Sequence, residues 1–215
     1  MQMFSQTFEH SLPIDLESFG FVQREKKNGE TVAFRCGRDF LYYALHYYYP
    51  GTYGPSHINP QKIEDLFGAR LPWWLMWSSL QFTKVPKLLR DAGLELHINN
   101  RQVRSFLFFF WSIAAPRRVS VEDALRVVEN SIDKKEVAGI DISLGLFGLV
   151  DHILFVYAYD VENLYVFDTH DLSKKVEYEK LTPATDNRFI MKLPKSVIHK
   201  RWTRFGRVWT VKKVV

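Results

Sequence analysis

The spacing of hydrophobic residues divides the chain into a mainly helical first part and a strand-rich last third. Hydrophobic positions recur at helical spacing in four segments, over residues 36–49, 60–67, 85–92 and 120–132. Pro50 and Gly51 follow the first segment as a stop signal. Ser120 is placed to cap the last segment, and Asp123 to complete a capping box. We therefore expect four helices ahead of most of the strands.

Runs of β-branched and aromatic residues dominate the remainder of the chain. They predict strands over residues 94–98, 137–142, 152–159, 164–168, 189–193 and 208–214. The turn signal Asp160–Asn163 joins two of these strands as an antiparallel hairpin. The order of elements predicts an α+β fold, in which a central helix packs on a C-terminal antiparallel sheet. We expect one domain over residues 1–215, with residues 1–29 as an N-terminal extension.

Composition narrows the class of protein. The 215-residue chain is 47% hydrophobic and contains one cysteine, so no intramolecular disulfide can form. Its most apolar run, the ten residues 106–115, is shorter than the roughly 20 residues that cross a bilayer. No signal peptide is visible at the N-terminus. We therefore expect a soluble, cytoplasmic protein without a membrane partner and with unknown oligomeric state.

The net charge of +5 is mild for 215 residues. Basic residues alternate with Trp202, Phe205 and Trp209 between residues 195 and 213. This pattern could form a nucleic-acid surface, but it also fits the solvated face of a strand pair. We favour the strand pair, and nucleic acid is therefore not the expected partner.

Cys36 stands at the predicted start of the first helix. Unpaired backbone N–H groups at a helix N-terminus favour the thiolate form of a cysteine. Gly37 follows and leaves room for a substrate backbone. A lone cysteine is more often a small buried hydrophobe, so this position alone does not assign a function.

His152 and Asp168 strengthen the case for chemistry at Cys36. If the two hairpin strands pair around the turn, Tyr159 lies opposite Leu164, and His152 lies just beyond Asp168 near the open end. A carboxylate at that point can fix the tautomer of an imidazole and stabilise its protonated form. The alternatives are a histidine satisfied in the core and an aspartate that caps the loop over residues 169–173.

The order of these segments resembles the papain-like cysteine peptidases of the bacteriocin-processing type, which cut after a double-glycine leader. The resemblance rests on the CG pair that opens a buried helix, on VEDALRVVENS leading to VAGIDI, and on DHILFVYAYDVENLYVFDT. It covers about residues 30–214. It implies a papain-like fold and a catalytic triad of Cys36, His152 and Asp168.

The same resemblance implies acyl transfer. His152 would accept the proton of Cys36, and the sulfur would attack an amide carbonyl of a peptide or protein substrate. Water would then hydrolyse the resulting thioester. No cofactor or metal is implied. The oxyanion would lie near the backbone N–H of Cys36. Glu30 and Gly37 occupy the positions that the resemblance implies for oxyanion or substrate binding.

This chain departs from the family pattern at three positions. Glu30 stands where the family has a glutamine that donates to the oxyanion, and an ionised carboxylate cannot donate. Asp151 replaces a glycine and Thr169 a proline. Because of Glu30, the sequence leaves a second hypothesis open: a catalytically impaired relative that binds a peptide or protein in the same cleft.

A metal site is the remaining alternative. Asp168, His170 and Asp171 form a short cluster, which could include His152. Its spacing matches no standard metal site, and the chain has no HExxH, CxxC or phosphate-binding glycine loop. We therefore expect no metal.

Overall fold

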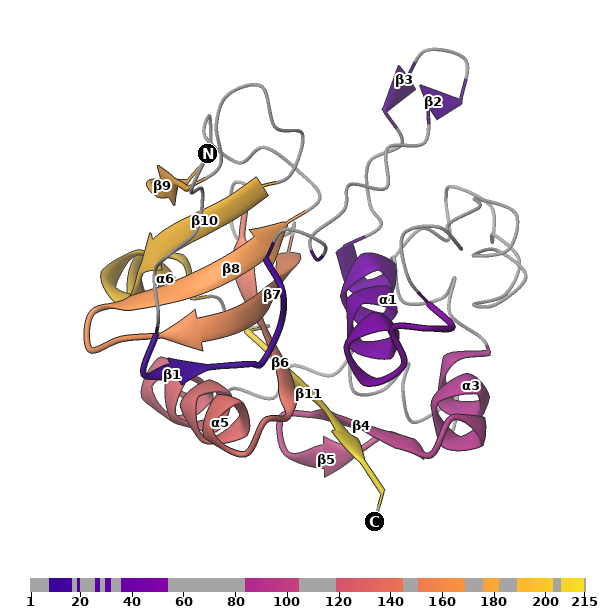
Figure 1. Cartoon of the computed structure of the whole chain (residues 1–215). Coiled ribbons are helices and arrows are strands. Elements are labelled where there is room, and N and C mark those ends of the chain that lie inside the picture. The colour runs from indigo at the N-terminus through magenta and orange to yellow at the C-terminus, as the bar shows by residue number, and fades with distance from the viewer. Residues whose placement is uncertain are drawn as a thin grey trace.

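The computed structural model describes residues 8–16, 19, 26–27, 30–31, 36–53, 84–104, 119–144, 151–168, 176–181, 189–202 and 206–214. Over these residues it is a mixed α/β structure built around a large antiparallel sheet (Figure 1). The predicted helix over residues 60–67, the apolar run over residues 106–115 and the candidate metal ligands His170 and Asp171 lie outside the described residues.

The described helices are α1 (Cys36–Tyr48), α3 (Val85–Asp91), α5 (Val121–Asp133) and α6 (Lys195–Arg201). Three of them confirm predicted helices to within one or two residues. Ser120 caps α5 as expected, because its hydroxyl accepts a hydrogen bond from the backbone N–H of Asp123 at 3.0 Å. The last helix, α6, was not predicted. Within the described residues, no helix has the length and apolar character needed to cross a membrane.

The main sheet follows the order β5-β4-β11-β6-β7-β8-β10-β9, and β1 also pairs with β7. Its strands are β1 (His10–Ser11), β4 (Leu94–Ile98), β5 (Arg101–Gln102), β6 (Val137–Ser143), β7 (Asp151–Tyr159), β8 (Asn163–Asp168), β9 (Glu179–Lys180), β10 (Phe189–Pro194) and β11 (Val208–Lys213). A separate two-stranded ribbon joins β2 (Lys26–Lys27) to β3 (Glu30–Thr31). All pairings are antiparallel, as the sequence predicted.

The N-terminal segment belongs to this sheet. Strand β1 pairs with the last residues of β7, beyond the point where β6 stops pairing with that strand. The backbone N–H of Leu12 also donates to the carbonyl of Tyr157 at 2.7 Å. Residues 8–16 therefore extend the core of the domain.

Helix α1 packs on β6 and β7, while α5 packs on β6, β11, β1 and β7. The close approach of α1 depends on Gly139 in β6. A Cβ atom at this position would lie 2.5 Å from the ring of Phe40 in α1 and 2.9 Å from the carbonyl oxygen of Leu154. A larger residue would force α1 away from the sheet.

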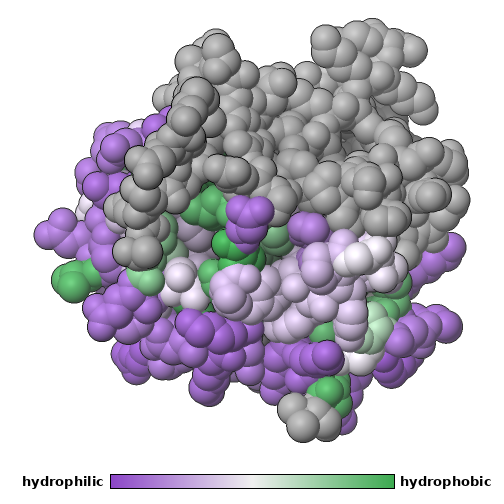
Figure 2. Space-filling view, viewed as in Figure 1, coloured by the Kyte–Doolittle hydropathy of each residue, from purple (hydrophilic) through white to green (hydrophobic). Residues whose placement is uncertain are grey.

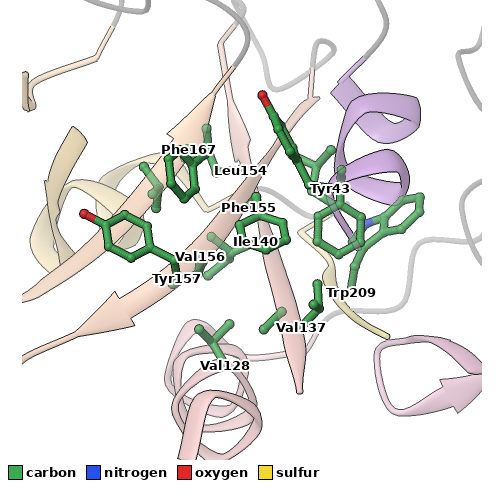
Figure 3. Close-up of a cluster of buried hydrophobic side chains, with 14 of the residues drawn as sticks. Tyr43, Val128, Val137, Ile140, Leu154, Phe155, Val156, Tyr157, Phe167 and Trp209 are labelled. Atoms are coloured by element: carbon green, nitrogen blue, oxygen red, sulfur yellow. The ribbon is translucent and has the colours of Figure 1, made fainter. Parts of the chain in front are cut away.

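Aromatic rings fill the space between α1 and the β7–β8 hairpin. Tyr43 extends from α1 toward Phe155 of β7 and Phe167 of β8, and all three side chains are buried (Figure 3). In Figure 1, the N-terminal end of α1 lies beside the end of the sheet at which β7 begins and β8 ends. The packing thus brings Cys36 to the open end of the hairpin. The described surface in Figure 2 is largely hydrophilic, with small separate hydrophobic areas.

Candidate functional site

Cys36 is the first residue of α1 and is partly exposed to solvent. Its position at the helix N-terminus is the one predicted, and it places the thiol next to backbone N–H groups that have no partner within the helix. Gly37, the second residue of α1, is buried. Cys36 is therefore a partly buried residue at the edge of the core.

His152 and Asp168 form a buried pair at the open end of the β7–β8 hairpin. The Nε2–H of His152 donates to Oδ2 of Asp168 at 2.7 Å, and the two side chains are 7% and 2% exposed. A carboxylate can only accept a hydrogen bond, so this contact places a proton on Nε2. The other ring nitrogen, Nδ1, is left for a different partner.

That partner is Cys36. The side chain of Cys36 makes a hydrogen bond with His152 and interacts with it electrostatically. The structure thus brings the thiol of Cys36, at the N-terminus of α1, into contact with the imidazole of His152 on β7, as the sequence predicted. Cys36, His152 and Asp168 form a connected chain of three side chains.

The protonated form of His152 is favoured by this environment. Burial by itself lowers the pKa of His152, because it disfavours the charged imidazolium. The charge of Asp168, the charge of Cys36 and the hydrogen bonds to both groups act in the opposite direction. Together they raise the pKa of His152 well above its ordinary value of 6.5.

The hairpin register differs from the prediction in one respect, and the difference matters for the site. Tyr159 pairs with Leu164 as expected, but a β-bulge between Val156 and Ala158 shifts the pairing by one residue. Beyond the bulge, Phe155 pairs with Phe167. Tyr157 is the additional residue.

The bulge decides whether the histidine and the carboxylate can meet. In a uniform register, Phe155 would lie opposite Asp168, and His152 would then project from the other face of the hairpin. With the observed shift, Asp168 falls on the same face as His152, as its diagonal neighbour. A single extra residue on β7 therefore aligns the pair.

A small pocket lies behind the thiol, between α1 and the hairpin. Its lining residues are Cys36, Asp39, Phe40, Tyr43, Ile153, Phe155, Phe167 and Asp168. Asp39 is buried and lies three residues after Cys36, within the first turn of α1. Burial, followed by the charges of Asp39 and Asp168, raises the pKa of Tyr43 well above 10.0, so its hydroxyl stays protonated.

A third buried carboxylate, Asp141 of β6, lies near His152. Oδ2 of Asp141 accepts a hydrogen bond from Nε of Arg207 at 2.6 Å, and its charge interacts with His152. Burial raises the pKa of Asp141 despite the opposing effect of Arg207. Sequence reasoning overlooked Asp39 and Asp141. The available signals were an acidic residue one turn from the cysteine and an acidic residue inside the apolar strand VAGIDI.

The described structure gives the backbones of Glu30 and Asp151 but not their side chains. Glu30 lies in β3, where its backbone pairs with Lys27, and its side chain is outside the described part of the structure. The side chain of Asp151 is likewise not described. The oxyanion roles of Glu30 and Gly37 stay predictions. No cluster of potential metal ligands occurs among the described residues.

The basic C-terminal stretch is only partly a strand, because Val208–Lys213 forms β11, which pairs with β4 and β6. Residues 195–201 form α6 instead, directly after β10. Four basic side chains of the whole C-terminal stretch face carboxylates: Lys195 with Glu129, Lys200 with Glu177, Arg207 with Asp141 and Lys212 with Glu95. Trp209 is buried, and the indole N–H of Trp202 donates to the carbonyl of Val119 at 2.9 Å.

Comparison of the chain with protein-family models, with curated proteins and with solved structures finds no match in any of the three.

Proposed function

We propose that the protein is a cysteine hydrolase that cleaves an amide bond of a peptide or protein through Cys36, His152 and Asp168. The observation that carries this proposal is the buried bond between Nε2 of His152 and Oδ2 of Asp168 at 2.7 Å, together with the hydrogen bond between His152 and Cys36. The chain order of cysteine, histidine and aspartate, with a helix-borne thiol against an antiparallel sheet, supports a papain-like arrangement.

The mechanism uses each group at a defined atom. His152 holds the proton of Cys36 on Nδ1, and the thiolate sulfur attacks the carbonyl carbon of the scissile amide. The proton then passes from Nδ1 to the leaving amine, and a thioester remains on Cys36. A water molecule, deprotonated by the now neutral His152, attacks the thioester and releases the acid product. Asp168 keeps the ring orientation and stabilises the imidazolium.

The N-terminal end of α1 supplies the electrostatic stabilisation. The developing oxyanion forms beside Cys36, where the backbone N–H groups of the first helical turn have no helical partner. The helix dipole favours negative charge at the same point. A side-chain donor would add to this effect, and its usual position is occupied by Glu30.

Two alternatives to this proposal come from the sequence. The impaired-relative hypothesis rests on Glu30, because loss of one oxyanion donor costs about 100- to 1000-fold in rate. The nucleic-acid hypothesis has little support, since four of the described basic residues in the C-terminal stretch face carboxylates, Trp209 is buried and the indole N–H of Trp202 is hydrogen-bonded.

Alkylation of the single cysteine by iodoacetamide at pH 5 tests the proposal. Free cysteine is almost fully protonated at this pH, so we expect Cys36 to react at least about tenfold faster than free cysteine. His152→Ala should remove this excess. Equal rates for the wild type, His152→Ala and free cysteine would refute the proposal.

Turnover separates the active enzyme from an impaired one. Incubation with a mixed peptide library, followed by mass spectrometry, should show cleavage that Cys36→Ala lacks. If the wild type alkylates rapidly but cleaves nothing, and Glu30→Gln gains cleavage, the chain is an impaired relative with an intact dyad.

A further inference from the structure

Phe19 of the N-terminal segment lies between the two elements that carry the catalytic groups. Its ring is 4% exposed. On the side of α1, it lies 5.5 Å from the ring of Tyr43 and 4.9 Å from the ring of His46. On the side of the hairpin, its centroid is 5.4 Å from Phe155 and 5.1 Å from Phe167. One side chain therefore contacts both halves of the site.

The residues that Phe19 contacts are close to the reacting groups along each element. Tyr43 is two helical turns from Cys36, Phe155 is three residues after His152, and Phe167 directly precedes Asp168. Tyr43, Phe155 and Phe167 also line the pocket behind the thiol. Because interiors are close-packed, the volume of the ring at position 19 influences the separation of α1 from the hairpin.

The segment that carries Phe19 is itself held in register. The backbone N–H of Phe19 donates to the carbonyl of Asp15 at 2.8 Å. Upstream, β1 pairs with β7, and Nδ1 of His10 bonds to Oδ1 of Asp133 at 2.8 Å. The ring is thus inserted by a segment anchored on the same strand that begins with His152.

We propose that Phe19 is a positioning residue, which sets the distance between Cys36 and His152 by wedging α1 apart from the β7–β8 hairpin. This inference rests on the proposed function, since it concerns the geometry of that dyad. A shift of about 1 Å in a reacting group can reduce a rate by about 100-fold. Removal of the wedge should therefore impair the dyad without touching any reacting atom.

Phe8 provides a matched control in the same segment. Its ring contacts Tyr157 at 5.9 Å and Tyr165 at 4.3 Å, both of which belong to the hairpin. Phe8→Ala removes a ring of the same size from the same segment. Unlike Phe19→Ala, it leaves the contacts to α1 in place.

The experiment compares the rate of Cys36 alkylation by iodoacetamide at pH 5 in folded wild type, Phe19→Ala, Phe8→Ala and His152→Ala. We expect Phe19→Ala to lose about 10- to 100-fold of the His152-dependent rate, and Phe8→Ala to stay near the wild type. Urea denaturation shows whether the two phenylalanine variants lose similar stability. Phe19→Leu keeps a branched apolar side chain and should be intermediate; it replaces Phe19→Ala if that variant does not fold.

The outcomes separate the two proposals. A His152-dependent rate that survives in Phe19→Ala, or that falls equally in Phe8→Ala, overturns the positioning role and leaves the proposed function standing. A wild-type rate equal to that of His152→Ala removes the proposed function, and the role of Phe19 with it. A selective loss in Phe19→Ala, graded through Phe19→Leu, supports the wedge.

Discussion

A histidine–aspartate pair lies near each end of strand β7, and the two pairs have almost the same nitrogen–oxygen distance. At its start, Nε2 of His152 lies 2.7 Å from Oδ2 of Asp168. At its other end, where β1 joins it, Nδ1 of His10 lies 2.8 Å from Oδ1 of Asp133. Distance alone therefore does not distinguish a candidate catalytic pair from a structural one.

The two pairs differ in burial and in the third side chain that each pair contacts, which is Cys36 for the pair at the start of β7 and Tyr159 for the pair at its other end. The side chains of His10 and Asp133 are 40% and 46% exposed, whereas those of His152 and Asp168 are 7% and 2% exposed. Tyr159 donates a hydrogen bond to Asp133 and its ring stacks on His10, so the exposed pair fastens β1 and α5 to the sheet. The buried pair instead contacts a thiol, which is a nucleophile. The two pairs therefore differ in their surroundings and not in their distances.

The largest expected contrast is in stability. Asp168→Ala leaves His152 buried without its carboxylate and should lower the free energy of unfolding by about 3–5 kcal/mol. Asp133→Ala removes a solvent-screened pair and should cost about 0.2–1 kcal/mol for that ion pair. Urea denaturation of both variants at pH 7 measures the difference. Equal losses would break the distinction drawn from burial.

The next contrast is in the reactivity of the thiol. Asp168→Asn keeps a hydrogen-bond acceptor but removes the charge that favours the imidazolium, so the His152-dependent alkylation rate at pH 5 should fall about tenfold or more. Asp133→Asn, the matched change at the other end of β7, should have no effect. An equal fall in both variants would show that net charge, and not the local pair, controls the thiol.

The dependence of stability on pH sharpens the comparison further. Because the pKa of His152 is raised in the folded protein, its contribution to stability is complete below about pH 6.5 and is lost as the pH rises through the folded pKa. With Cys36 in place, the stability advantage of His152 over a His152→Gln variant should therefore fall above pH 6.5, by up to about 1.4 kcal/mol per pH unit. An advantage that grows with pH would contradict the assigned direction.

The smallest expected effect concerns the strand between the two pairs. In the described structure, the hydroxyl of Tyr157 is buried and has no hydrogen-bond partner. Tyr157→Phe keeps the bulge and the ring, so it should leave alkylation unchanged and stabilise the fold by up to about 1 kcal/mol. Thermal denaturation measures the gain. A large loss of reactivity would mean that the hydroxyl, in addition to the bulge, serves the site.

Local patterns predicted most elements of the fold. The start of α1 at Cys36, the strand Leu94–Ile98 and the serine cap of α5 all follow from spacing and capping within a few residues. The helix α6 was overlooked because its basic residues and Trp202 resemble an exposed strand, whereas Pro194 at the N-cap begins a helix. The short strands β1, β5 and β9 carry two residues each, too few for a periodic signal.

The three site residues were also predictable, because each occupies the end of an element that its own sequence defines. Their alignment was not. The bulge at Tyr157 carries no glycine or proline that would mark it, and without it the register places Asp168 on the wrong face. Asp141 and Phe19 were missed because their proximity to the site depends on packing between segments far apart in the chain, whereas Asp39 lies within one helical turn of Cys36 and was overlooked despite that local signal.

The sequence by itself determined that a thiol begins a buried helix and that a histidine and an aspartate end two strands of one hairpin. These features depend on neighbouring residues, and local periodicity encodes them. Only the tertiary structure decided that the three groups meet, that one histidine–aspartate pair is buried while its counterpart is exposed, and that Phe19 contacts both α1 and the hairpin. Those outcomes depend on close packing across the whole core, where one extra residue in a strand or one ring between two elements changes which atoms touch.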